Sequence, residues 1–155
     1  MKFLCDEMLQ RLGNWLRAAG YDTLIESDGR SDYELLRHAI DEHRYLITRD
    51  QKLMEHRRAP GNVILLSCDN LEECVQSLSE QLAIDWHYHP FMRCTVCNTP
   101  LSIASAKQIE TIPENSRKVT SEAFYCPTCD QVYWEGSHVK RMRTQLAQWH
   151  TLYNS

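Results

Sequence analysis

Residues 2–20, KFLCDEMLQRLGNWLRAAG, set the fold class of this chain. The first four of them form a short apolar run that predicts a buried strand, and the run stops at Asp6. From Met8 onward, apolar residues recur every three or four positions, which predicts an amphipathic helix ending at Gly20. A strand followed directly by a helix is the building unit of an α/β fold.

The same alternation of strand and helix continues beyond Gly20. In order, the sequence predicts a strand at 22–26, a helix at 31–43, a strand at 45–48, a short helix at 51–57, a strand at 63–66 and a helix at 71–82. Ser31 and Glu34 form a capping box that marks the start of the second helix. We therefore expect residues 1–83 to form a domain with a parallel sheet flanked by helices.

The composition is that of a folded, water-soluble protein, with 155 residues of which 43% are hydrophobic and 25% charged. The net charge of −4 is unevenly distributed. Residues 1–90 carry 10 basic and 16 acidic side chains, whereas residues 91–155 carry 7 basic and 5 acidic ones. The acidic total therefore conceals a basic excess near the C terminus.

No apolar stretch has the length of a signal peptide core or a membrane span. The longest aliphatic run, residues 63–66, is far shorter than the roughly 20 residues that cross a bilayer. We expect a cytoplasmic protein with no membrane partner. Because thiols stay reduced there, we expect no disulfides among the seven cysteines. Cys5, Cys68 and Cys74 are predicted to be small buried apolar residues.

The other four cysteines form two C-x-x-C pairs, Cys94 with Cys97 and Cys126 with Cys129, separated by 28 residues. Four thiolates at this spacing are typical of a structural Zn²⁺ site, which stabilises a module too small for a large core. The alternative is a set of free thiols or a redox pair. A four-cysteine site leaves no coordination position open, so this metal is not expected to be catalytic.

The residues around the cysteine pairs extend this interpretation. Asn98 and Asp130 each follow the second cysteine of a pair, and both residue types tolerate the left-handed backbone that such a turn requires. Residues 93–155 are therefore predicted to form a small C-terminal zinc ribbon with a terminal helix. Residues 84–92, IDWHYHPFM, are predicted to be a packed connector.

Three carboxylates have similar places in the predicted α/β domain. Asp6 and Asp50 directly follow strands, and Asp32 opens a helix. Since ligand clefts form at the carboxyl ends of parallel strands, these side chains are candidates to converge on Mg²⁺ or Mn²⁺. Such an ion would support phosphodiester hydrolysis. Glu7 and Asp69 are possible additional members.

Helix capping is the competing interpretation of these carboxylates. Aspartate at a helix start stabilises the helix by about 1 kcal/mol without any metal. Placement in the sequence alone does not decide between the two.

Motifs spread over nearly the whole chain resemble one known family. They are Phe3–Asp6, Met8–Leu9, Arg11–Leu12, Trp15–Arg17, Gly20–Asp22, Leu46–Asp50, Arg93–Cys94, Cys97–Asn98, Cys126–Cys129, Val132–Trp134, Gly136–His138 and Arg141–Met142. Together they resemble the PIN-like ribonuclease domain at the C terminus of mut-seven exonucleases. The resemblance implies a PIN-like α/β domain with an appended zinc ribbon and an acidic cluster that binds Mg²⁺ or Mn²⁺ and hydrolyses RNA.

Within that resemblance, Asp6, Asp32 and Asp50 take the positions of the acidic cluster. Asp6 and Asp50 lie inside matched motifs, whereas Asp32 rests on a looser match to an acidic residue that opens the following helix. No fourth carboxylate is assigned.

Several basic residues are candidates for contact with RNA phosphates. Arg11 and Arg17 lie on the first predicted helix, although a solvated helix face explains them equally well. A denser basic group near the C terminus consists of His138, Lys140, Arg141 and Arg143. Beside it, Tyr133 and Trp134 are candidates to stack on bases or, alternatively, to form the core of the ribbon.

The sequence thus predicts a metal-dependent ribonuclease whose zinc ribbon aids RNA binding. The alternative is a non-catalytic RNA-binding or ribosome-associated adaptor, in which the carboxylates are helix caps. A protein-interaction module is a third possibility.

Overall fold

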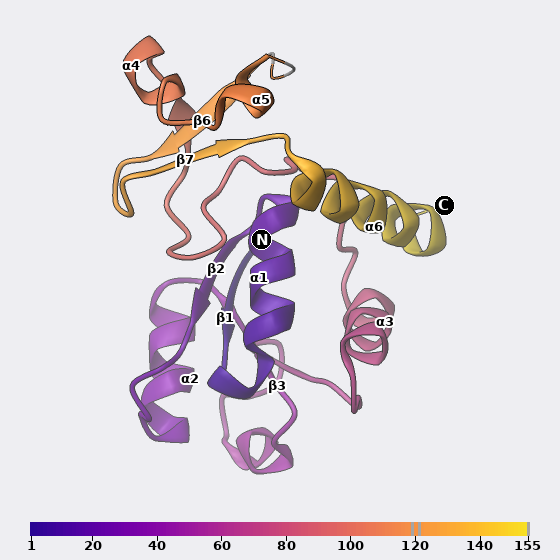
Figure 1. Ribbon diagram of the computed structural model, residues 1–155. Coiled ribbons are helices and arrows are strands. Elements are labelled where there is room, and N and C mark those ends of the chain that lie inside the picture. The colour runs from indigo at the N-terminus through magenta and orange to yellow at the C-terminus, as the bar shows by residue number, and fades with distance from the viewer. Residues whose placement is uncertain (119, 121, 155) are drawn as a thin grey trace.

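The computed structural model describes residues 1–118, 120 and 122–154. It contains a four-stranded parallel sheet with helices on both faces, a smaller three-stranded antiparallel sheet and a long C-terminal helix (Figure 1). The larger part comprises β1 (Lys2–Cys5), η1 (Glu7–Leu9), α1 (Gln10–Ala19), β2 (Asp22–Ile25), α2 (Asp32–Asp41), β3 (Tyr45–Thr48), η2 (Gln51–Glu55), β4 (Val63–Leu65) and α3 (Leu71–Gln81). The remainder comprises β5 (Ser102–Ile103), α4 (Ala106–Ile109), α5 (Glu114–Arg117), β6 (Ala123–Cys126), β7 (Gln131–Trp134) and α6 (Ser137–Tyr153).

The strands of the larger sheet run parallel in the order β2-β1-β3-β4. Cys5 pairs with Ile25 on one side and with Ile47 on the other. The residues that follow these strands, among them Asp6 and Glu26, consequently share one edge of the sheet, which we call the carboxyl edge. The predicted α/β fold class is confirmed.

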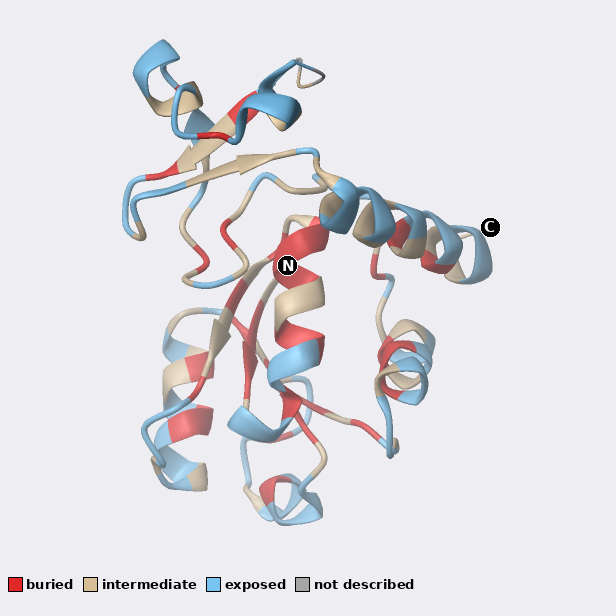
Figure 2. Cartoon of the chain, in the orientation of Figure 1, coloured by how far each residue is buried: buried red, intermediate tan, exposed pale blue. Residues whose placement is uncertain are grey.

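The side chains of the larger sheet alternate between two apolar layers. Phe3 and Cys5 face a core formed with α1, α3 and α6, whereas Leu4 faces a second core formed with α2. Figure 2 shows buried residues concentrated in these strands and in α1, whereas α4 and α5 contain none. Successive side chains face opposite layers because a strand is pleated, and both layers are buried because helices cover both faces of the sheet.

Helix α1 ends at Gly20, as its sequence predicts. Gly20 has φ of 108°, the left-handed conformation that glycine adopts without steric cost, and its N–H bonds to the Arg17 carbonyl. A Cβ at this position would lie 2.5 Å from the His89 carbonyl oxygen. The glycine therefore both stops α1 and admits the connector at its C-terminal end.

The connector, residues 84–92, is packed, as expected. Trp86 is completely buried, and its Nε1 donates a hydrogen bond to Ser79 Oγ at 2.9 Å. Trp149 from α6 meets the rings of Trp86 and Trp15 edge to face, at centroid distances of 5.1 and 4.8 Å. Helix α6 therefore returns from the smaller sheet to complete the core of the larger one.

Candidate functional site

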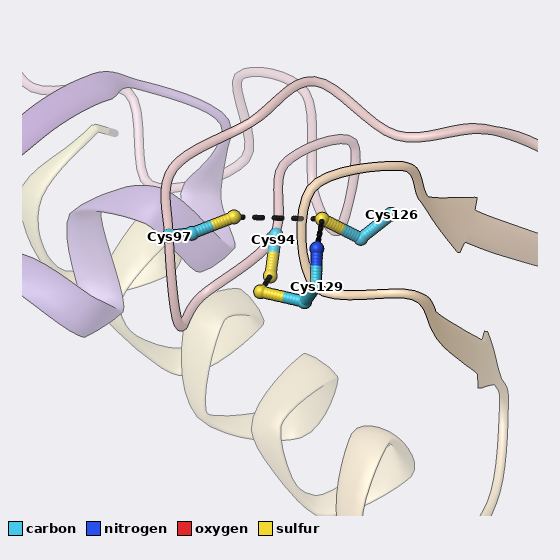
Figure 3. A group of neighbouring side chains, drawn as sticks. All are labelled: Cys94, Cys97, Cys126 and Cys129. Carbon is cyan, nitrogen blue, oxygen red and sulfur yellow. Dashed lines mark hydrogen bonds between the residues drawn. The ribbon is translucent and has the colours of Figure 1, made fainter.

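Four thiols come together where the smaller sheet meets the loop after the connector. The Sγ atoms of Cys94, Cys97, Cys126 and Cys129 all lie within 4.8 Å of one another (Figure 3). Within residues 1–118, 120 and 122–154, no other group of three or more histidine, cysteine or acidic side chains is arranged to hold a metal ion. The cluster has the donor set and tetrahedral ligand count of a structural zinc site.

The backbone of both cysteine turns has the predicted left-handed residues. Asn98 has φ of 73° and Asp130 has φ of 53°. Their N–H groups bond to the carbonyls of Cys94 and Cys126, respectively, which closes each turn around its thiols.

Polar contacts around the thiols tune their acidity. Burial opposes ionisation of Cys97, but hydrogen bonds to Thr99 and to neighbouring cysteines lower its pKa to about 6. On the other side of the cluster, the Tyr133 hydroxyl lies 3.1 Å from Cys94 Sγ. Burial, together with hydrogen bonds to neighbouring cysteines, raises the pKa of Cys126, and such hydrogen bonds raise the pKa of Cys129 to about 12, so these thiols differ in how readily they ionise. Only thiolates are strong metal ligands.

The first cysteine turn is fastened to the larger sheet by Arg17. The Arg17 side chain is buried, with Nε bonded to the Thr23 carbonyl and Nη1 to the carbonyls of Thr95 and Val96. This corrects the expectation that Arg17 contacts RNA. The helical pattern placed Arg17 on a polar face, but the cysteine turn covers that face.

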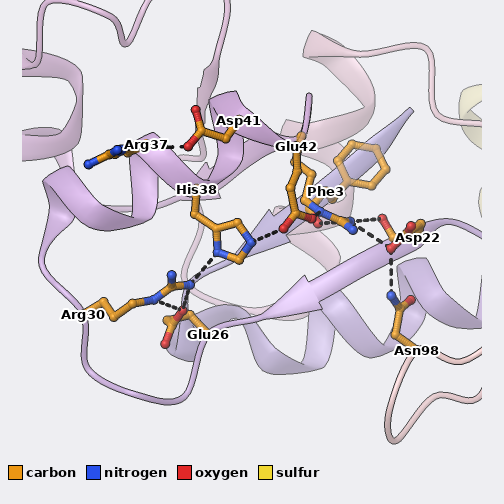
Figure 4. Close-up of polar contacts among 10 residues, drawn as sticks. Phe3, Asp22, Glu26, Arg30, Arg37, His38, Asp41, Glu42 and Asn98 are labelled. Atoms are coloured by element: carbon orange, nitrogen blue, oxygen red, sulfur yellow. Dashed lines mark hydrogen bonds and ion pairs between the residues drawn. The ribbon is translucent and has the colours of Figure 1, made fainter.

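A chain of paired charges runs along the side of α2 from the carboxyl edge to the cysteine turn (Figure 4). Its members, in order, are Glu26, Arg30, His38, Glu42, Arg44, Asp22 and Asn98. Hydrogen bonds from Arg30 lower the pKa of Glu26, and those from Arg44 lower the pKa of Glu42. Glu26 follows β2 at the carboxyl edge, but its charge is already neutralised by Arg30.

Asp6 has a distinctive place at the carboxyl edge. Its Oδ2 accepts a hydrogen bond of 2.8 Å from Thr48 Oγ1, whereas its Oδ1 is buried and has no hydrogen-bond partner among the described residues. Asp6 does not cap η1, the helix that it precedes. A buried carboxylate oxygen without a partner is costly unless a water or a cation satisfies it.

Asp50 and Asp32 differ from Asp6 in what their side chains do. Asp50 donates its N–H to Thr48 Oγ1, and its Oδ1 accepts from Lys52 N at 2.9 Å, so it caps η2. Asp32 is the first residue of α2, after the N-cap Ser31. The capping interpretation therefore describes Asp50, whereas Asp32 lies where the helix dipole favours a negative charge.

The convergence of Asp6, Asp32 and Asp50 on one metal ion stays a prediction. Asp6 and Asp50 are joined through Thr48, and in the described residues the carboxylates of all three are not gathered as the cysteine thiols are. Position at one sheet edge does not dictate side-chain direction, so the shared edge alone does not determine how these carboxylates lie. Thr48 and Glu26 were not predicted as residues of this site. Both lie at strand ends, and position at a strand end is the signal that identified Asp6.

A cleft of about 250 Å³ lies beside the carboxyl edge, between the start of α1 and the start of α3. Arg11, Arg49 and Asp69 are among its lining residues. Arg11 is exposed, so it remains a candidate for phosphate contact.

A disulfide between Cys68 and Cys74 lies at the rim of this cleft. This corrects the prediction that neither residue is oxidised. The chain reverses between them at the N-cap of α3, Asn70, which brings their Cα atoms to 5.0 Å. Cys5, by contrast, is completely buried as expected, and burial raises its pKa to about 12.

The C-terminal basic residues lie at the opposite end of the molecule from Asp6. His138, Lys140 and Arg143 line a cavity of about 330 Å³ between the smaller sheet and the first turns of α6. Arg141 is exposed on the same helix but does not line the cavity. Figure 1 shows this end beyond the C terminus of α1, whereas Asp6 lies just before η1 and α1.

Comparisons with known proteins give one match. A family model described as Mut7-C RNAse domain matches residues 1–146. Searches among curated proteins and among solved structures found no match. Within the described residues, no helix has the length and apolar character needed to cross a membrane.

Proposed function

Since this chain belongs to the Mut7-C RNAse domain family, which points to a ribonuclease-type function with RNA as substrate, we propose that it is a metal-dependent ribonuclease. Hydrolysis of the phosphodiester bond takes place at the carboxyl edge of the parallel sheet, around Asp6. The zinc ribbon at the other end of the sheet aids RNA binding.

The observation that carries the proposal is the unpaired oxygen of Asp6. Asp6 Oδ1 is buried without a partner among the described residues, whereas Thr48 holds Oδ2 in place. Hard carboxylate oxygens are the donors that Mg²⁺ and Mn²⁺ prefer, and a cation at Oδ1 would remove the cost of leaving that atom unsatisfied. The residues at this position therefore fit the ion.

Asp50 and Asp32 are the further candidate ligands. Asp50 is exposed and tied to Asp6 through Thr48, and Asp32 begins α2 on the side of the sheet that Glu26 occupies. A bound Mg²⁺ or Mn²⁺ supplies an activated water and neutralises charge on the scissile phosphate. Arg11, exposed at the neighbouring cleft, contacts the RNA phosphates.

The cysteine cluster holds Zn²⁺ in a structural role. With four protein ligands the ion has no position for water or substrate, so it does not take part in hydrolysis. Instead it fixes the ribbon that presents His138, Lys140, Arg141 and Arg143.

The test is cleavage of single-stranded and structured RNA with Mn²⁺ by the wild-type protein and by Asp6→Asn. Asp41→Asn is the matched control, because Asp41 is exposed at the far end of α2 and, among the described residues, forms an ion pair with Arg37 alone. We expect Asp6→Asn to lose at least a hundredfold in rate and Asp41→Asn to lose less than twofold. Cleavage that Asp6→Asn leaves intact, or no cleavage by any of the proteins, would remove the enzyme proposal.

A non-catalytic RNA-binding adaptor is the second candidate. It is favoured by the absence of a gathered carboxylate group in the described residues and by the capping role of Asp50. In that case neither the wild type nor any variant cleaves RNA. Asp6→Asn binds RNA as the wild type does, whereas charge reversal at Lys140 and Arg141 abolishes binding.

A further inference from the structure

A cavity lies between the smaller sheet and α6. Its volume is about 330 Å³, and three segments far apart in sequence form its walls. These are the end of the connector with the first cysteine turn, strands β6 and β7, and the first two turns of α6. Its volume is near the lower limit of cavities that hold small ligands.

Aromatic side chains form much of the cavity wall. Phe91, Phe124, Tyr133 and Trp134 all line it, and none of the four is fully buried. Exposing the face of an aromatic ring to water costs free energy. A planar base that stacks on the ring covers that surface, and any of the bases can do so.

The remaining wall carries three cationic side chains, Arg93, Lys140 and Arg143, and two acidic ones, Glu122 and Glu135, of which Glu135 is paired with Arg143. Arg143 lies over the Phe91 ring at 5.0 Å and donates to Glu135, and Arg93 donates to the Asn98 carbonyl. Lys140 is exposed at the rim. Two anchored guanidinium groups and one exposed ammonium beside aromatic rings suit a ligand with a flat ring and a phosphate.

From this combination we propose that the cavity binds one unpaired nucleotide of single-stranded RNA, with its base on the aromatic wall and its phosphate at Lys140. The identity of the polymer rests on the proposed function, whereas the flat ring and the anion follow from the lining itself.

The place of the cavity then sets the length of RNA that the protein uses. The connector reaches the C-terminal end of α1 through bonds from His89 and Phe91 to the carbonyls of Ala19 and Ala18, and Asp6 lies beyond the N-terminal end. The 10 residues of α1 separate the two ends by about 15 Å. A stacked strand at roughly 3.4 Å per nucleotide needs about four or five nucleotides to cover that distance.

Binding is measured first, without added Mg²⁺ or Mn²⁺, by anisotropy of a labelled 12-nucleotide single-stranded RNA. Lys140→Glu and Trp134→Leu are compared with Lys107→Glu, which makes the same charge change on an exposed residue of α4 outside the cavity. We expect at least a tenfold loss of affinity for the first two and less than twofold for the control. Zinc content and circular dichroism establish that each variant is folded.

Competition identifies the occupant. Single-stranded RNA should displace the label, whereas duplex RNA and a free nucleoside monophosphate should do so at least tenfold less well. A polyglutamate peptide that competes as well as RNA would assign the cavity to an acidic protein partner and overturn the proposal. So would equal affinity of the wild type, Lys140→Glu and Trp134→Leu for RNA.

Failure here is distinguishable from failure of the ribonuclease proposal. If cleavage depends on Asp6 but RNA binding does not depend on Lys140 or Trp134, only the proposal for the cavity is rejected. If RNA binding depends on the cavity residues but no RNA is cleaved, only the ribonuclease proposal is rejected. If both hold, RNAs of about two nucleotides are too short to bridge the two ends and should resist cleavage, whereas RNAs of about eight or more should be cut. Equal cleavage of both lengths would contradict the bridging arrangement.

Discussion

The side-chain oxygen of Asn98 accepts a hydrogen bond of 3.0 Å from the backbone N–H of Thr23. This bond joins the first cysteine turn to β2, the edge strand of the parallel sheet. The Asn98 amide nitrogen also donates to Asp22 at 2.7 Å. One residue in a left-handed conformation thus shapes the metal site and pairs a main-chain group at the sheet edge that would otherwise be buried unsatisfied.

Asn98→Ala is expected to lower the free energy of unfolding by about 2–4 kcal/mol. The substitution removes two hydrogen bonds from buried groups. It also places alanine at a positive φ, a conformation that alanine adopts less readily than asparagine does. Asn98→Gly loses the same bonds but relieves the backbone, so its cost should be about 1 kcal/mol smaller. Urea denaturation of the zinc-loaded proteins measures both, and equal stability of the wild type and Asn98→Ala would contradict the role.

Arg17→Ala is expected to destabilise the protein by about 2–4 kcal/mol, because three carbonyls lose a charged donor in a buried place. Arg11→Ala, an exposed change of the same type on the same helix, should cost less than about 0.5 kcal/mol. Thermal denaturation compares the two. If the two variants had the same melting temperature within error, the buried contacts of Arg17 would not be maintained in solution.

Reduction of the Cys68–Cys74 disulfide is expected to cost about 2 kcal/mol, the chain-entropy value for so short a loop. A Cys68→Ser and Cys74→Ser double variant should match the reduced wild type and no longer respond to dithiothreitol. Thiol counting by mass spectrometry on denatured protein measures the bond directly. Seven reactive thiols in protein purified without reductant would contradict the bond.

Stability should depend on Glu26 in a pH-dependent way. Arg30 holds the pKa of Glu26 below its usual value of 4.5 in the folded protein. The ionised carboxylate therefore adds stability that is fully present above the unfolded pKa and is lost as the pH falls through the lower, folded pKa. Glu26→Gln should cost about 1–3 kcal/mol at pH 7, and this cost should shrink as the pH is lowered through the folded-state pKa. Urea denaturation over a series of pH values measures it.

Removal of zinc should weaken more than the ribbon. We expect one Zn²⁺ per chain by elemental analysis, and a chelator should lower the melting temperature of the whole protein, because Arg17 and Asn98 tie the cysteine turn to the parallel sheet. Cys126→Ser should reproduce the effect. Since ligands must lose protons, zinc should also dissociate more readily as the pH falls.

The parts of the structure that depend on local pattern were predictable from the sequence. A short apolar run placed β1, helical spacing and Gly20 placed α1, and the C-x-x-C spacing with Asn98 and Asp130 described the cysteine turns. Each of these signals lies within a few neighbouring residues, so tertiary contacts had little to add.

What depends on contacts between distant segments was not predictable. Arg17 is buried only because residues 95 and 96 cover it, and no helical pattern contains that information. The disulfide follows from the chain reversal at Asn70, whereas the prediction rested on the cellular compartment. The direction of the Asp6, Asp32 and Asp50 side chains likewise depends on partners such as Thr48.

Trp149 completes the core that Trp15 and Trp86 begin, so the order of synthesis limits when this protein can fold. While the ribosome is still adding the ribbon, the parallel sheet lacks the helix that covers its tryptophans, and that apolar surface remains exposed. Contacts between the two ends of a chain form slowly because a long loop must close first. Until α6 docks, the chain therefore carries exposed apolar surface, which favours aggregation.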